Sequence, residues 1–166
     1  MGALGVAESD DIVVYDAQGL FSAARVWWTL RTMGAKRVRV LDGGLPKWRA
    51  EGRPLQVGAA EAPVPAKFEA RFDADAVTDF DQVGAALADG LQVVDARGAA
   101  RFRGEAPEPR PGVRAGHMPG ALNLPFPHLL NADGTLKQGR ALEEAFRAAG
   151  VDLELSLIHI SEPTRP

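Results

Sequence analysis

A strand–helix–strand–helix pattern near the N-terminus constrains the fold of this chain most. Ile12–Tyr15 is a β-branched run that predicts a buried strand, and residues 20–33 predict a helix that is apolar around most of its circumference. Val38–Leu41 predicts a second strand, and Leu45–Glu51 predicts a short helix with Pro46 in its first turn. Strands and helices that alternate over short connections are typical of a parallel sheet flanked by helices, so we expect an α/β fold.

The rest of the chain predicts a similar alternation after a linker. Residues 53–67 are rich in Pro, Ala and Gly, a composition typical of linkers. The elements predicted after it are an edge strand at Phe68–Phe72, a helix at Asp79–Ala88, strands at Leu91–Asp95 and Ala121–Leu124, and an amphipathic helix at Gly139–Ala149. Residues 155–166 continue neither pattern, and we interpret them as a non-native tail that stands outside the fold.

Composition excludes several classes of function. The net charge of −3 argues against a nucleic-acid-binding protein, which normally carries an excess of basic residues. No run approaches the roughly 20 apolar residues that a membrane span needs. The N-terminus shows no signal peptide, so we expect a cytoplasmic protein. No metal-binding or phosphate-binding motif is present, and we therefore expect no metal and no cofactor.

The chain contains no cysteine. Disulfides, thiolate metal sites and thiol nucleophiles are therefore all excluded for the sequence as it stands.

The loop RFRGEAPEPRPGVRAGHMPGA, at residues 101–121, is rich in arginine although the chain is acidic overall. Arg101 and Arg110 could converge on one small anion, because a guanidinium matches a carboxylate with two parallel hydrogen bonds. The alternative is a solvated loop whose arginines pair with Glu105 and Glu108.

A second candidate loop follows the first strand, with Asp16, Gly19 and Ser22 in DAQGLFSA. A strand, a tight turn and a helix N-terminus can aim backbone N–H groups at an anion. The alternative is that Asp16 or Ser22 caps the helix.

We predict structural roles for the other chemically conspicuous side chains. His117 lies in a turn without a nucleophilic partner, so we interpret it as structural rather than as a general base. The other residues with a predicted structural role are Arg97, Arg103 and Arg114 in or beside the arginine-rich loop, and Trp27, Trp28 and Trp48 in the core.

Three motifs occur in the order DGGxxxW, RFxGxxPEPR and GHxPGAxNxP. Together they resemble the tandem-domain rhodanese-like sulfurtransferases, from Gly2 to about Leu153. The resemblance implies a five-stranded parallel sheet in each domain. It identifies residues 1–52 as the C-terminal half of a first, non-catalytic domain and residues 68–154 as the N-terminal half of a second, catalytic domain. The chain is then a fragment that lacks both ends of the tandem protein.

The resemblance also implies a reaction, the transfer of a sulfane sulfur from 3-mercaptopyruvate to a thiol or cyanide acceptor through a cysteine persulfide. In the family, the positions of Arg101 and Arg110 hold the carboxylate and carbonyl end of the donor, and Asp16 marks a degenerate first-domain loop. Because the nucleophilic cysteine is absent, we expect this chain to be inactive. The alternatives are a thiosulfate:cyanide sulfurtransferase and a non-catalytic module that binds an anion or a partner protein.

The predicted strands also allow an unusual arrangement. Two strands precede the linker and three follow it, which together make up one five-stranded sheet. We hypothesise a single composite sheet across the linker, because a two-stranded sheet alone is marginally stable. The alternative is two separate, incomplete sheets.

Overall fold

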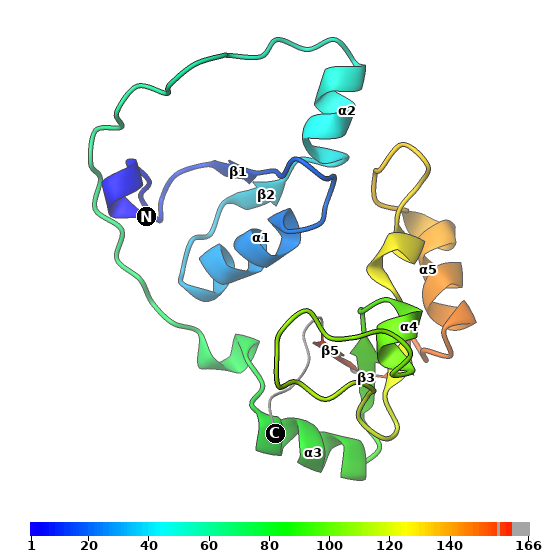
Figure 1. Cartoon of the computed structure of the whole chain (residues 1–166). Coiled ribbons are helices and arrows are strands. Elements are labelled where there is room, and N and C mark those ends of the chain that lie inside the picture. The colour runs from blue at the N-terminus through cyan, green and yellow to red at the C-terminus, as the bar shows by residue number, and fades with distance from the viewer. Residues whose placement is uncertain (156, 161–166) are drawn as a thin grey trace. The chain divides into compact units, whose positions relative to one another are not determined.

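The computed structural model describes residues 1–155 and 157–160, and these fold into two compact units (Figure 1). Of these residues, unit 1 comprises 1–77 and 132–136, and unit 2 comprises 78–131, 137–155 and 157–160. Parallel strands accompanied by helices occur in both units, as the sequence predicts.

Unit 1 is built on two parallel strands. Strand β1 (Ile12–Val14) pairs with β2 (Val38–Val40), and helix α1 (Ala23–Thr32) connects them. Leu30, Ala35 and Val38 form the buried cluster between helix and sheet. Helix α2 (Gly44–Ala50) follows β2, and the 3-10 turns are η1 (Gly2–Leu4) and η2 (Ala74–Ala76).

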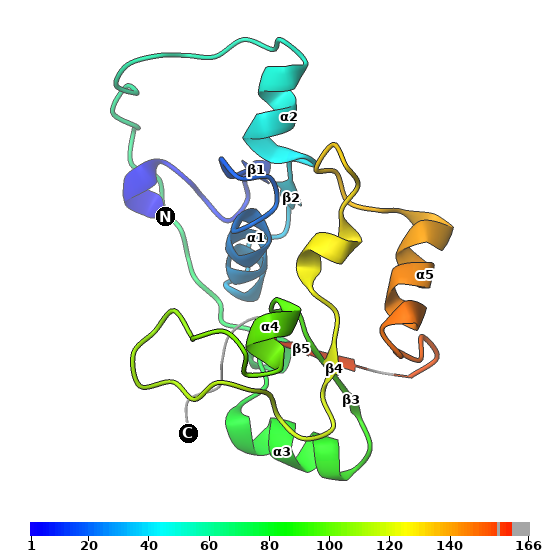
Figure 2. The same ribbon diagram turned by 45° about the vertical axis from the view of Figure 1, so that its right-hand side comes forward.

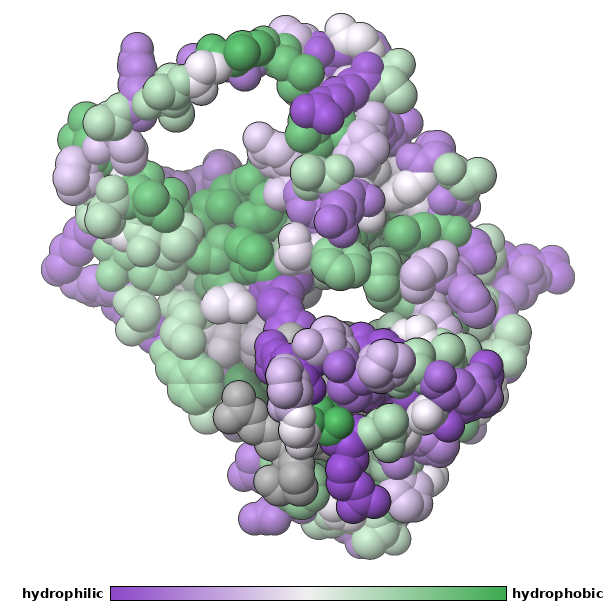
Figure 3. Space-filling view, viewed as in Figure 1, coloured by the Kyte–Doolittle hydropathy of each residue, from purple (hydrophilic) through white to green (hydrophobic). Residues whose placement is uncertain are grey.

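One face of α1 and one face of the small sheet stay exposed. Val13 in β1 is 53% exposed and Tyr15, directly after β1, is 59% exposed. Figure 3 shows apolar side chains at the surface of unit 1. Trp28 is also exposed, so its predicted core position is wrong. The apolar circumference of the helix predicts packing on both sides, and this is wrong as well, because Val26 and Trp28 leave one side of α1 exposed. Because unit 1 has one small sheet of two strands, α1 packs against that sheet on one side only. Trp27 and Trp48 are half-buried, and the Trp27 indole N–H donates to the Val38 carbonyl at 2.9 Å.

The edge strand predicted at Phe68–Phe72 is not formed. Phe68 packs against the buried cluster of unit 1 instead. The backbone N–H groups of Arg71 and Asp73 donate to the carbonyls of Met33 and Thr32, at 2.9 and 2.8 Å. Residues 68–77 therefore lie in unit 1, because an apolar anchor and backbone hydrogen bonds hold them at the end of α1.

Unit 2 has a parallel sheet with β3 (Gln92–Asp95) in its centre (Figure 2). Strands β4 (Leu122–Asn123) and β5 (Leu157–Ile160) flank it. Val94, Leu124 and Val151 form the buried cluster of this unit. The remaining elements are α3 (Phe80–Ala88), α4 (Ala99–Phe102), the 3-10 turn η3 (Phe126–Leu129) and α5 (Gly139–Ala148).

Two predictions are wrong, one about the tail at residues 155–166 and one about a composite sheet. We expected residues 155–166 to stand outside the fold, but Leu157–Ile160 pair with β3 along its whole length. Residues 156 and 161–166 lie outside the described residues. Within the described part of the chain, no strand before residue 53 pairs with a strand after residue 67, so the composite sheet is wrong. Both edges of β3 are already occupied, by β4 and β5.

Candidate functional site

The C-terminal end of β3 carries a buried ion pair between Asp95 and Arg97. The side chains are 2% and 5% exposed. The Arg97 guanidinium donates to both Asp95 carboxylate oxygens, with the shortest contact 2.6 Å from Nη2 to Oδ2. The hydrogen bond with Asp95 raises the pKa of the Arg97 guanidinium above its ordinary value, so the cation is the stable form. This arrangement supports the predicted structural role of Arg97.

Glu108 extends this pair into the arginine-rich loop. Its side chain is 1% exposed and bridges two guanidiniums. Oε1 accepts from Arg97 Nη1 at 2.7 Å, whereas Oε2 accepts from Arg101 Nη2 at 2.5 Å and from Nε at 3.2 Å. A buried carboxylate of this kind is stable when cations and hydrogen bonds surround it, and here both oxygens are used.

Arg101 is the member of this network that reaches solvent. It lies in α4, and its side chain is 28% exposed while the other three members are nearly fully buried. Glu108 therefore fixes the Arg101 guanidinium through Nε and Nη2, while part of the side chain remains accessible to solvent.

The other arginines of the loop are exposed at the surface. Arg110, the second predicted site residue, is exposed, as is Arg114. Arg103 pairs with Glu105 at 2.7 Å, and both side chains are more than half exposed. Such exposed pairs contribute little stability. The structure thus places Arg101 in an organised network and Arg110 on the surface of the same loop.

His117 ties the loop to α4. Its ring stacks on Phe102 with centroids 3.7 Å apart, and its Nδ1 lies 2.7 Å from the Phe102 carbonyl oxygen. These contacts support the structural role that the sequence predicts for His117.

Asn123 was not identified by sequence reasoning. From β4 its side-chain amide donates to the carbonyl oxygens of Asp95 and Arg97, at 2.8 and 2.9 Å. It thereby fixes the backbone on which the buried ion pair stands. The available signal was a single amide side chain in the otherwise apolar strand ALNLP.

Asp16 turns inward in the DAQGLFSA loop of unit 1. Its carboxylate accepts hydrogen bonds from the backbone N–H groups of Gln18, Ser22 and Ala23, at 2.9, 2.8 and 2.9 Å. Burial opposes ionisation, but these hydrogen bonds outweigh it and hold the pKa of the Asp16 carboxyl below its ordinary value. The backbone N–H groups that could bind an anion in this loop are therefore occupied by the chain's own carboxylate.

Of the two possible helix caps, Asp16 is the one that binds backbone N–H groups at the start of α1. Ser22 occupies the N-cap position of α1 without a capping hydrogen bond from its side chain. Gly19 is buried in the turn with a φ of 80°.

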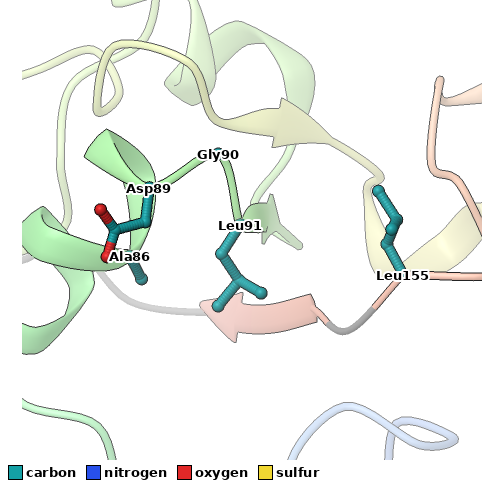
Figure 4. A pocket seen from close by; sticks show the side chains of 5 residues that line it. All are labelled: Ala86, Asp89, Gly90, Leu91 and Leu155. Atoms are coloured by element: carbon teal, nitrogen blue, oxygen red, sulfur yellow. The ribbon is translucent and has the colours of Figure 1, made fainter.

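One hollow in unit 2 has no arginine in its lining (Figure 4). It is lined by Ala86, Asp89, Gly90, Leu91 and Leu155. Its single carboxylate and apolar side chains offer nothing to an anionic ligand. Among the described residues, no group of three or more His, Asp or Glu side chains is placed to hold a metal ion. None of the helices in that part of the chain has the length and hydropathy that a membrane span requires.

Comparison with known proteins agrees with the architecture of the two units. The family model of the rhodanese-like domain matches residues 3–51. The chain is 43% identical over 159 residues to the 3-mercaptopyruvate sulfurtransferase of Escherichia coli, covering 95% of this chain and 56% of that protein. With the human 3-mercaptopyruvate sulfurtransferase the identity is 41% over 160 residues, covering 95% and 54%.

The chain is also similar to a relative whose name includes two sulfur donors and to two solved structures. The mitochondrial thiosulfate/3-mercaptopyruvate sulfurtransferase 1 of Arabidopsis thaliana is 39% identical over 173 residues, covering 92% of this chain and 46% of that protein. The crystal structure of SseA from Escherichia coli superposes with a TM-score of 0.84 at 39% identity, covering 95% of this chain and 58% of that one. Tum1 from Saccharomyces cerevisiae gives a TM-score of 0.78 at 32% identity, covering 95% and 55%.

These superpositions define the class of the protein as α/β with the rhodanese fold. The chain belongs to the family of rhodanese-like 3-mercaptopyruvate sulfurtransferases, and it spans about half the length of the curated relatives that it matches.

Proposed function

We propose that this chain carries the donor-binding arginines of a 3-mercaptopyruvate sulfurtransferase without the nucleophile of the reaction. In this proposal residues 1–52 are the second half of a non-catalytic domain, residues 53–67 are a linker, and residues 68–154 are the first half of a catalytic domain. Residues 155–166 are a non-native tail, whose segment Leu157–Ile160 pairs with β3 in place of a native strand.

The observation that carries the proposal is the guanidinium of Arg101. It is held by a buried carboxylate, and the Arg101 side chain is 28% exposed. A guanidinium fixed in this way is suited to a planar carboxylate, to which it can donate two parallel hydrogen bonds. 3-Mercaptopyruvate has such a carboxylate and thiosulfate has none, so the site favours 3-mercaptopyruvate. Arg110, from the same loop, would bind the carbonyl end of the donor.

The missing part of the reaction is the sulfur acceptor on the enzyme. In the family reaction a cysteine thiolate attacks the donor sulfur, the carbon–sulfur bond breaks, and pyruvate leaves after taking up a proton. Neither Asp16 nor Ser22 can form a persulfide, and the chain has no cysteine. The chain therefore binds the donor without transferring its sulfur to a thiol or to cyanide.

Two other functions are distinguished by donor preference and by activity. A thiosulfate:cyanide sulfurtransferase is supported by the name of the Arabidopsis relative, which includes both donors. A non-catalytic module that binds an anion or a partner protein is supported by the absence of cysteine in this chain.

The test combines activity with binding. The purified chain should release no pyruvate from 3-mercaptopyruvate and form no thiocyanate from cyanide, but it should bind pyruvate, which shares the carboxylate and carbonyl of the donor. Arg101→Ala should abolish that binding. Thiocyanate above a protein-free control would contradict the predicted inactivity, and binding of thiosulfate in preference to pyruvate would favour the alternative donor.

A further inference from the structure

We propose that Glu108 is a positioning residue, which orients the Arg101 guanidinium for the carboxylate of the ligand by tying it to Arg97. The inference rests on the proposed function, because it assumes that Arg101 binds a carboxylate.

The contacts of Glu108 divide between two arginines that differ in exposure. Its Oε1 accepts from Arg97, whose side chain is 5% exposed, and its Oε2 accepts from Arg101, whose side chain is 28% exposed. The carboxylate itself is 1% exposed. Glu108 thus stands between a buried cation and one that reaches solvent.

Arg97 supplies the fixed end of this arrangement. Besides its bonds to both Asp95 oxygens, its Nη2 donates to the Gly116 carbonyl oxygen at 2.8 Å. Asp95 is the last residue of β3, so the ion pairs run without interruption from the central strand to Arg101. An arginine side chain has many rotamers, and fixing it before the ligand arrives lowers the entropic cost of binding.

The same loop contains a pair that lacks this anchorage. Arg103 donates to Glu105 through Nε and Nη2, at 2.7 Å each. Both side chains are more than half exposed, so this pair has similar chemistry without burial. Glu105→Gln is therefore a matched control, with the same substitution and the same change of charge in one loop.

A positioning role and a purely electrostatic role of Glu108 predict opposite changes in anion affinity when the residue is replaced by Gln. Replacing Glu108 by Gln removes a negative charge beside Arg101, and on electrostatic grounds alone anions should then bind more tightly. If Glu108 acts by orienting the guanidinium, the same substitution should weaken binding. The Gln amide group also places N–H donors against the donors of one arginine, so one of the two contacts is lost.

The experiment is a titration of the whole chain with pyruvate, followed by NMR of the arginine Nε–H groups. For Glu108→Gln we expect at least a tenfold loss of affinity and faster hydrogen exchange at the Arg101 Nε–H. Glu105→Gln should change affinity by less than twofold. Glu108→Asp keeps the charge but shortens the side chain, so it should also weaken binding. The amide signals of Val93 and Val94, which are buried in β3, report whether each variant is folded.

The outcomes separate this inference from the proposed function. If wild type fails to bind pyruvate, the proposed function is wrong and the inference falls with it. If wild type binds, Arg101→Ala does not, and Glu108→Gln binds equally well or better, the inference alone is overturned. Should Glu108→Gln not fold, Glu108→Asp decides, because unchanged affinity in that variant would show that charge without geometry is sufficient.

Discussion

Removing the Asp16 carboxylate should destabilise unit 1 selectively. The side chain accepts three backbone hydrogen bonds, from the N–H groups of Gln18, Ser22 and Ala23, and it caps α1. Loss of a helix cap costs about 0.5–2 kcal/mol, and hydrogen bonds to a charged group contribute about 1.5–3 kcal/mol each. Because water can replace part of these bonds in a half-buried loop, we expect Asp16→Ala to cost about 2 kcal/mol.

Tryptophan emission during urea unfolding measures this effect in unit 1 alone. All three tryptophans, Trp27, Trp28 and Trp48, belong to that unit. Asp10→Ala is the control, since the Asp10 carboxylate accepts one exposed hydrogen bond, from the Ala7 N–H at 2.8 Å. We expect the control to cost less than about 0.5 kcal/mol, as most surface substitutions do. Equal small losses in both variants would refute the capping role of Asp16.

The pH dependence of the same experiment has a defined sign. The folded-state pKa of the Asp16 carboxyl lies below its unfolded value. The stabilisation is therefore complete above the ordinary aspartate pKa of about 3.9, and it is lost as the pH falls through the lower folded-state pKa. The difference between wild type and Asp16→Asn should shrink over that acidic range. A difference that grows toward low pH would contradict the assignment.

Three other substitutions test the remaining features. Arg97→Leu leaves two buried carboxylates without their shared cation and should cost about 3–5 kcal/mol, measured as a loss of hydrogen-exchange protection in β3. Gly44→Ala should destabilise unit 1 by about 1–2 kcal/mol in the tryptophan assay. The Gly44 φ is 56°, and an added Cβ would lie 3.0 Å from a carbonyl oxygen. In a full-length form that carries the cysteine, Arg110→Ala should reduce 3-mercaptopyruvate use by about tenfold to a hundredfold and spare thiosulfate use, because a lost charged contact costs about 1.5–3 kcal/mol. Arg114→Ala is the control, and equal losses on both donors would show that Arg110 acts through loop structure.

The sequence predicts the regular elements of this chain well where the pattern is local. The helix predicted at Asp79–Ala88 forms at Phe80–Ala88, and Asp79 and Gln82 make a reciprocal capping box at its start. The strand predicted at Leu91–Asp95 forms at Gln92–Asp95. The apolar pattern is sufficient for the strand, and for the helix the capping box adds to it.

The predictions fail where distant residues decide. The alternation at Phe68–Phe72 suits an edge strand, but Phe68 packs on the buried cluster of unit 1 and the Arg71 and Asp73 N–H groups bond to carbonyls at the end of α1. Sequence alone gives Glu108 as one of two acidic partners, beside Glu105, whereas its burial depends on Arg97, which the fold brings close. The sequence offers both Asp16 and Ser22 as caps of α1 and does not choose between them, because the Asp16 hydrogen bonds span six or seven residues, beyond the usual capping distance.

The small sheet of unit 1 has a consequence for behaviour in solution. Among the described strands, β1 and β2 pair only with each other, so each has an open edge, and Val13 and Tyr15 are exposed beside them. Charged side chains near such an edge discourage a second copy from pairing with it. Arg37 and Arg39, exposed and both 3.4 Å from Asp11, are the charges available here. Their repulsion between copies is screened as the Debye length falls from about 10 Å at 0.1 M salt to about 3 Å at 1 M. Self-association of the chain should therefore increase with ionic strength.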